Sequence, residues 1–143
     1  MAHATYDDVN LLLRLYDMRR EERTRAARSW FVANFKVKSM AEFNTLCPPG
    51  SEQNAMARQV TSYWDMVGSF INAGVLNPDL FFQSNRELLT VWIRMMPVIE
   101  EIRGTFKDPS YMKNLENAGN AYIEYLNKIS PETYPAFKAR VGG

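Results

Sequence analysis

The stretch from Ser51 to Arg103 constrains the fold of this chain more than any other part of the sequence. Ser51 is a favoured helix N-cap, and apolar residues then recur every three or four positions up to Gly74, where a left-handed C-terminal cap is expected. Asn77-Pro78 restarts helical geometry at once, because asparagine caps a helix and proline suits its first turn. The pattern predicts two amphipathic helices joined by a short connection.

The second of these helices is expected to continue as far as Gly104. Ser84 and Glu87 have the spacing of a capping box near its start. Pro97 lies inside it, and proline both lacks a backbone N–H and clashes with the preceding turn. We therefore expect a kink at Pro97.

The segment from Thr5 to Phe35 contains no glycine or proline and predicts one continuous helix, with Thr5 as its N-cap. Such a helix would be roughly 45 Å long, against roughly 30 Å for the others, so one end is expected to overhang or bend. The positions expected to face inward recur at three- and four-residue steps: Val9, Leu12, Leu13, Tyr16, Arg20, Arg23, Ala27, Trp30 and Phe31.

The rest of the chain predicts one short helix at residues 39–46 and a last long helix from Asp108-Pro109 to Ser130-Pro131. No segment has the alternation of a strand. We expect an all-α fold: an up-and-down bundle of four long helices with one short extra helix between the first and second. Residues 1–143 are expected to form this single domain, with 130–143 as a loosely ordered tail.

Composition narrows the class of protein. The chain has 17 Lys and Arg against 16 Asp and Glu, so its net charge of +1 disfavours nucleic-acid binding. The single cysteine, Cys47, cannot form an internal disulfide, and the N-terminus lacks the apolar run of a signal peptide. The longest apolar run, residues 88–102, is interrupted by Arg94 and is too short for a membrane span. We expect a cytoplasmic protein without a transmembrane segment.

Catalytic and metal-binding patterns are weak in this sequence. A di-metal bundle needs several glutamates and histidines, and the chain has only His3. The adjacent pair Glu100-Glu101 fits a solvated last turn of a helix. Neither Cys47 nor any serine has a histidine that could serve as its base. We therefore predict no catalytic residue, no metal and no cofactor.

The strongest local charge feature is a run of five arginines in the first helix. Part of the run is expected to pair with Glu21 and Glu22 on the helix surface, as Arg19–Glu22, Glu21–Arg25 and Glu22–Arg25. One alternative is contact with an anion or a partner protein, above all by Arg20 and Arg23, which fall on the apolar stripe. Another is that Arg20 and Arg23 pair with Asp or Glu inside the bundle. The candidate contact residues are Arg19, Arg20, Arg23, Arg25 and Arg28.

A pocket between helices is the competing site. Its expected lining is a set of aromatic residues, which serve equally well as core packing: Tyr63, Trp64, Trp92 and Tyr122.

Three segments carry a family resemblance: LRLYDMRREERTRAARSWFVANF, YWDMVGSFINAGVLNPDLFF and VWIRMMPVIEEIR. They resemble a family of small bacterial all-helical proteins known only as a domain of unknown function. The resemblance covers most of the chain. It implies a helical fold and brings no reaction or binding site with it.

The function favoured by these observations is contact with another protein, including a second copy of this chain. Aromatic residues, which are abundant here, are enriched at such interfaces. A small-molecule binder or enzyme with an inter-helix pocket is the first alternative, and weak nucleic-acid binding through the arginine run is the second.

Overall fold

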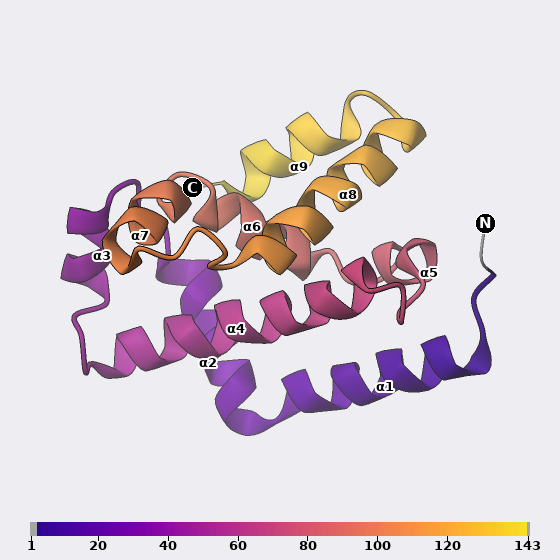
Figure 1. Cartoon of the computed structure of the whole chain (residues 1–143), viewed down its shortest axis with the longest axis horizontal. Helices are drawn as coiled ribbons and strands as arrows, with labels where there is room; N and C mark the ends of the chain where they lie inside the picture. The colour runs from indigo at the N-terminus through magenta and orange to yellow at the C-terminus, as the bar shows by residue number, and fades with distance from the viewer. Residues whose placement is uncertain (1–2, 143) are drawn as a thin grey trace.

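The computed structural model describes residues 3–142, which fold into helices and connecting loops without strands (Figure 1). The helices of this part of the chain are α1 (Tyr6–Arg20), α2 (Glu22–Asn34), α3 (Met40–Leu46), α4 (Glu52–Asn72), α5 (Pro78–Phe82), α6 (Glu87–Met95), α7 (Ile99–Phe106), α8 (Lys113–Ile129) and α9 (Thr133–Val141). The all-α class is confirmed. The four-long-helix arrangement is not, because two of the expected long helices are each divided.

The capping chemistry predicted for α4 is present at both ends. Ser51 accepts a hydrogen bond from the backbone N–H of Asn54 at 3.1 Å. Gly74 has a φ of 76°, and the N–H of Val75 reaches back to the carbonyl of Phe70 at 3.0 Å. This is the Schellman arrangement, in which glycine accepts the left-handed conformation without strain. The predicted helix ends are therefore confirmed for α4.

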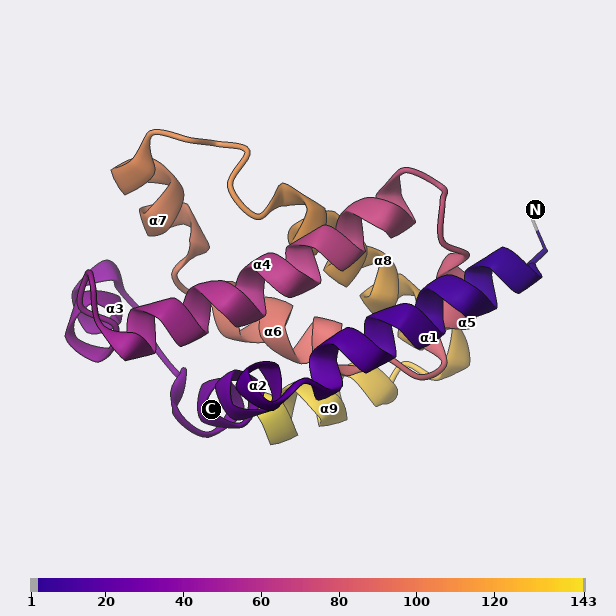
Figure 2. The same cartoon turned by 90° about the horizontal axis from the view of Figure 1, so that it is seen from below.

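The prediction of one continuous first helix is wrong, because the chain bends at Glu21. This residue has φ −56° and ψ 144°, and its carboxylate accepts from the backbone N–H groups of Arg23 (3.1 Å) and Thr24 (3.0 Å). Those donors lower the pKa of the Glu21 carboxyl. Glutamate thus caps α2, and Figure 2 shows the chain turning between α1 and α2.

The expected long helix ending at Gly104 is also divided. Pro97 produces a break instead of a kink, so α6 ends at Met95 and α7 begins at Ile99. The predicted capping box of Ser84 and Glu87 does not form: α6 begins without a side-chain cap, and the Glu87 carboxylate bonds to other elements.

The predicted start of the last long helix at Asp108-Pro109 is wrong as well. The Asp108 carboxylate accepts from the N–H (3.0 Å) and the hydroxyl (2.6 Å) of Ser110, which closes a local turn. The helix α8 begins only at Lys113, and its cap comes from α4, where Asp65 accepts from the N–H of Leu115 at 2.8 Å. A side chain distant in sequence therefore fixes this helix end.

Helix α4 is central, with α8 packed on one side and α2 on another (Figure 1). Two glycines permit close packing on α8. A Cβ on Gly68 would lie 2.6 Å from the carbonyl oxygen of Asn114, and a Cβ on Gly119 would lie 2.4 Å from the ring of Trp92. Both distances are too short for real contacts, so these positions require glycine.

The segment expected to be a loosely ordered tail forms α9. Phe137 is buried in the core cluster, and Arg94 donates from Nε to the carbonyl of Val141. The packing extends the core to the C-terminal end of the described chain, and only residue 143 of the expected tail lies outside the described residues.

None of the helices within residues 3–142 combines the length and the apolar character that crossing a bilayer requires.

Replacement of Gly119 tests the close packing of α8. We expect Gly119→Ala to destabilise the fold by about 1–3 kcal/mol, because the methyl group displaces the Trp92 ring. The control is Gly104→Ala in α7, where the methyl group meets nothing within 4 Å and alanine favours the helix by up to about 1 kcal/mol. Urea unfolding followed by circular dichroism measures both. Equal effects of the two substitutions would contradict the packing described.

The N-terminal end of α1 is tied to the α4–α5 connection through Asp8. Its carboxylate accepts from the N–H of Asn77 at 2.8 Å and from the N–H of Thr5 at 2.8 Å. These bonds, that from Asn77 first, lower the pKa of Asp8. A carboxyl whose pKa is lower in the folded state stabilises the protein above its unfolded pKa of about 4 and loses that contribution as the pH falls.

We expect Asp8→Asn to weaken the fall in the unfolding free energy as the pH is lowered below about 4. The substitution at the neighbouring exposed carboxylate, Asp7→Asn, is the control and should leave more of that fall in place. Urea unfolding over a pH series measures both variants. An unchanged pH dependence in Asp8→Asn would show that this anchor is unimportant.

Candidate functional site

The arginine run spans the bend at Glu21 and contains partly buried and exposed members on two helices. Arg19 and Arg28 are partly buried and bond to other helices, whereas Arg20, Arg23 and Arg25 are exposed. The prediction that Arg20 and Arg23 face the interior is therefore wrong. The bend rotates α2 relative to α1. The inward positions expected for one continuous helix therefore do not match the buried face of either helix.

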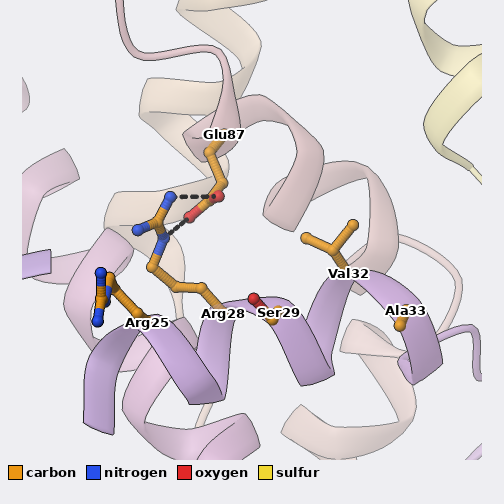
Figure 3. A pocket seen from close by; sticks show the side chains of 6 residues that line it. All are labelled: Arg25, Arg28, Ser29, Val32, Ala33 and Glu87. Carbon is orange, nitrogen blue, oxygen red and sulfur yellow. Dashed lines mark hydrogen bonds and ion pairs between the residues drawn. The ribbon is translucent and has the colours of Figure 1, made fainter. Parts of the chain in front are cut away.

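Arg28 and Glu87 form a bidentate ion pair between α2 and α6 (Figure 3). Nε lies 2.7 Å from Oε2 and Nη2 lies 3.0 Å from Oε1. The side chains are only 26% and 23% exposed. The hydrogen bonds that Arg28 donates to the Glu87 carboxylate are the main cause that raises the pKa of Arg28. Two parallel hydrogen bonds between a planar guanidinium and a carboxylate fix both the distance and the relative orientation of the two side chains.

The same carboxylate is bonded to α4. The indole N–H of Trp64 donates to Oε2 of Glu87 at 3.1 Å. Arg28 also donates from Nη1 to the carbonyl of Arg19 at 3.1 Å, at the C-terminal end of α1. One glutamate thus joins α6 to α2 and α4, and one arginine joins α2 to α1.

Arg19 closes the group from the α1 side. Its Nη1 lies 2.6 Å from Oδ1 of Asn85, and its guanidinium carbon lies 5.4 Å from the centroid of the Trp64 ring. We name these five residues the Arg28–Glu87 cluster: Arg19, Arg28, Trp64, Asn85 and Glu87. Its polar groups are engaged with one another, so it serves to hold the helices together.

The predicted surface pairs Arg19–Glu22, Glu21–Arg25 and Glu22–Arg25 do not form among the described residues. Glu21 is occupied with capping α2.

A hollow of about 490 Å³ lies beside the cluster (Figure 3). It is lined by Arg25, Arg28, Ser29, Val32, Ala33 and Glu87. Figure 3 shows Arg28 reaching toward Glu87, while Arg25 lies apart from both. Because Arg28 and Glu87 neutralise each other, Arg25 is the lining residue whose charge is not paired within the hollow.

The four aromatic residues expected to line a pocket are instead distributed through the packing. Trp64 and Tyr122 are fully buried, and Trp92 is buried against Gly119. Tyr63 is partly buried and donates from its hydroxyl to the carbonyl of Leu15 at 2.6 Å. None of the four lines the hollow beside Arg28.

Two buried arginines were not singled out by the sequence. Arg94 donates from Nη1 to the carbonyl of Phe35 at 2.9 Å, at the C-terminal end of α2, and burial lowers the pKa of Arg94. Arg103 donates from Nε to the carbonyl of Tyr111 at 2.8 Å. Both Arg94 and Arg103 interrupt an apolar helix face, and this interruption is the only sequence signal that could have indicated that the two side chains are buried.

Helix α1 has an outward apolar face that the sequence pattern placed inside. The exposed fractions are 87% for Tyr6, 41% for Val9, 58% for Leu13 and 46% for Tyr16. Leu15 is buried instead, with Leu11 and Leu12 partly buried beside it. We call the exposed row, Tyr6, Val9, Leu13 and Tyr16, the α1 stripe.

Within residues 3–142 there is no group of three or more histidine, cysteine, aspartate or glutamate side chains arranged to hold a metal ion.

Comparison with protein-family models identifies a family. The model of the family described as Domain of unknown function (DUF4760) matches residues 4–122. No curated protein and no solved structure matches the chain.

A double-mutant cycle tests the Arg28–Glu87 cluster. We expect Arg28→Ala and Glu87→Ala each to destabilise the fold, because removal of either side chain leaves the charge of the other partly buried and unpaired. The two substitutions should show a coupling free energy of about 1–3 kcal/mol. Exposed Arg25 is the control: Arg25→Ala should change stability by less than about 0.5 kcal/mol. Urea unfolding measures all four variants. Additive effects of the two cluster substitutions would refute the cluster as a linked unit.

Proposed function

Because the DUF4760 family model matches residues 4–122, the chain belongs to that family, and we propose that it is a helical protein-contact domain whose binding surface is the α1 stripe. The single observation that carries the proposal is the exposure of four large apolar or aromatic side chains along one face of one helix. A contiguous exposed apolar row marks an interaction site more often than isolated exposed residues do.

The stripe lies on an ordered helix that is fixed from behind. Asp8 ties the first turn of α1 to Asn77, Tyr63 bonds to the carbonyl of Leu15, and Arg19 enters the Arg28–Glu87 cluster. A surface already held in one conformation loses little conformational entropy when a partner binds. The anchoring therefore supports a docking role for the opposite face.

The side chains of the stripe suit a protein partner. Tyrosine offers a large apolar ring with a polar end, and it is enriched at protein interfaces. One exposed arginine, Arg20, follows the stripe at the C-terminal end of α1. Arginine is likewise enriched at interfaces, and here it supplies a charged rim.

We also propose a cytoplasmic location. The only cysteine, Cys47, is buried and unpaired, which suits a reducing compartment.

Site-specific photo-crosslinking tests the proposed surface. A photoreactive phenylalanine analogue in place of Leu13 or Tyr16 should yield covalent protein adducts when the native host cells are irradiated, because the stripe lies against a partner. The control position is Glu124 on α8, which is exposed and separated from α1 by α4 (Figure 1). Electrophoresis and mass spectrometry detect the adducts. Adducts no more abundant at positions 13 and 16 than at 124 would sink the proposal.

A further inference from the structure

We infer that α1 is a hinged arm. Straightening of the chain at Glu21 joins α1 and α2 into one continuous helix and swings α1 away from the rest of the molecule. The bent form is the main state, and the straight form is a second, less populated state of the same chain. The hinge is a property of this chain alone and does not depend on the proposed partner contact.

The sequence around the bend favours a continuous helix. No glycine or proline lies between residues 5 and 35, and residues 19–23 are all arginine or glutamate, which are good helix formers. Glu21 is the residue between α1 and α2, and it has a ψ of 144° where a helix requires a negative value. The backbone of this one residue therefore decides between the bent and the straight form.

The capping bonds at the bend have replacements in a continuous helix. In the bent form the Glu21 carboxylate accepts from the backbone N–H groups of Arg23 and Thr24. In a continuous helix these two N–H groups bond to the carbonyls four residues earlier, those of Arg19 and Arg20. Straightening thus exchanges one set of hydrogen bonds for another and leaves neither N–H group unpaired.

Two ion pairs are also exchanged for other contacts. The Glu21 carboxylate is occupied by the cap in the bent form, and Arg19 donates to Asn85. A continuous helix places Glu21 one turn from Arg25 and Arg19 one turn from Glu22, which is the spacing of favourable surface pairs. These are two of the pairs that the sequence predicts and the bent form lacks.

Few apolar groups hold α1 in the bent position. The buried residues of α1 are Asp8 and Leu15, and Leu11 and Leu12 are partly buried. The hydrophobic free energy grows with the apolar area buried, so a helix with this small buried face is weakly held by it.

The other attachments of α1 are single hydrogen bonds. Asp8 accepts from the N–H of Asn77, and Tyr63 donates to the carbonyl of Leu15. Each bond has a small net effect on stability, because water replaces the partner when the groups separate. An element held by few buried apolar contacts opens at a lower free energy than the core does.

The rest of the molecule keeps its hold on α2 when α1 leaves. Arg28 stays bonded to Glu87 of α6 and loses its bond to the carbonyl of Arg19, while α2 stays packed on α4. Figure 1 shows the α1–α2 connection at the lower edge of the molecule, with α2 running from it toward the interior. A straight α1 therefore projects outward from this edge.

Straightening changes which surfaces are accessible. It uncovers the inner face of α1, which carries Leu11, Leu12 and Leu15, and it releases the hydroxyl of Tyr63 on α4. Helix α1 is thus a strap that either lies on the body of the molecule or extends from it.

Two substitutions at the hinge act in opposite directions. Glu21→Ala removes the cap of α2 and keeps a good helix former, so it should raise the straight population on the order of tenfold. Glu22→Pro holds the bent form, because proline suits the first position of α2 and favours the extended ψ that Glu21 already has. In a straight helix the same proline lies in the interior, which should lower that population roughly a hundredfold.

Pulsed electron paramagnetic resonance measures the position of the arm. Nitroxide labels on cysteines that replace Asn10 of α1 and Glu124 of α8, both exposed, report the arm in a chain whose Cys47 is replaced by alanine. The helix from Asn10 to Glu21 is a lever of about 16 Å, so straightening moves the label far enough to resolve. A matched label pair at Ser62 of α4 and Glu124 reports the body alone.

We expect one main arm distance in the chain with Glu21 and Glu22 intact. Glu21→Ala should add a second, longer arm distance in about one tenth of the molecules or more. Glu21→Ala combined with Glu22→Pro should remove the longer distance. The body distance should stay the same in all three chains.

Three results would overturn the inference. A single, unchanged arm distance in Glu21→Ala would show that the hinge does not straighten. A longer distance that persists in the double variant would show that α1 leaves by local unfolding. A body distance that changes together with the arm distance would show general unfolding instead of a hinge.

Discussion

The bidentate ion pair between Arg28 and Glu87 is the interaction on which the arrangement of the first half of the molecule depends. After the bend at Glu21, α2 packs on α4, and the ion pair also fixes α2 to α6. Trp64 donates to the same carboxylate from α4, and Arg28 reaches the carbonyl of Arg19 at the end of α1. Removal of one partner would leave the other charge partly buried without compensation.

The surface that we propose to be functional follows from this anchoring. With its C-terminal end in the cluster and its N-terminal end tied through Asp8, α1 turns Leu15 toward the core and leaves the α1 stripe outside. The buried face of α1 is narrow, so its apolar residues exceed what the fold covers. Stability and proposed function thus occupy different faces of one helix.

Local capping was predictable from sequence where no distant residue competed for the capping side chain, and long-range pairing was not predictable. The helix ends at Ser51 and Gly74 were predicted correctly because both depend on residues within one turn. The bend at Glu21 was missed because glutamate is not a common N-cap and neither glycine nor proline marks the site. Glu87 was assigned to a cap, whereas its partner Arg28 lies 59 residues away. For the α1 stripe, periodicity identified the apolar positions but could not tell a buried apolar face from an exposed one.

Hydrogen–deuterium exchange followed by mass spectrometry tests the central claim most directly, on the chain purified alone and on the chain recovered with bound proteins from its native host. The account predicts slower amide exchange in the bound chain confined to α1, with α8 unchanged. Equal exchange in the two samples, or protection centred on another helix, would contradict it.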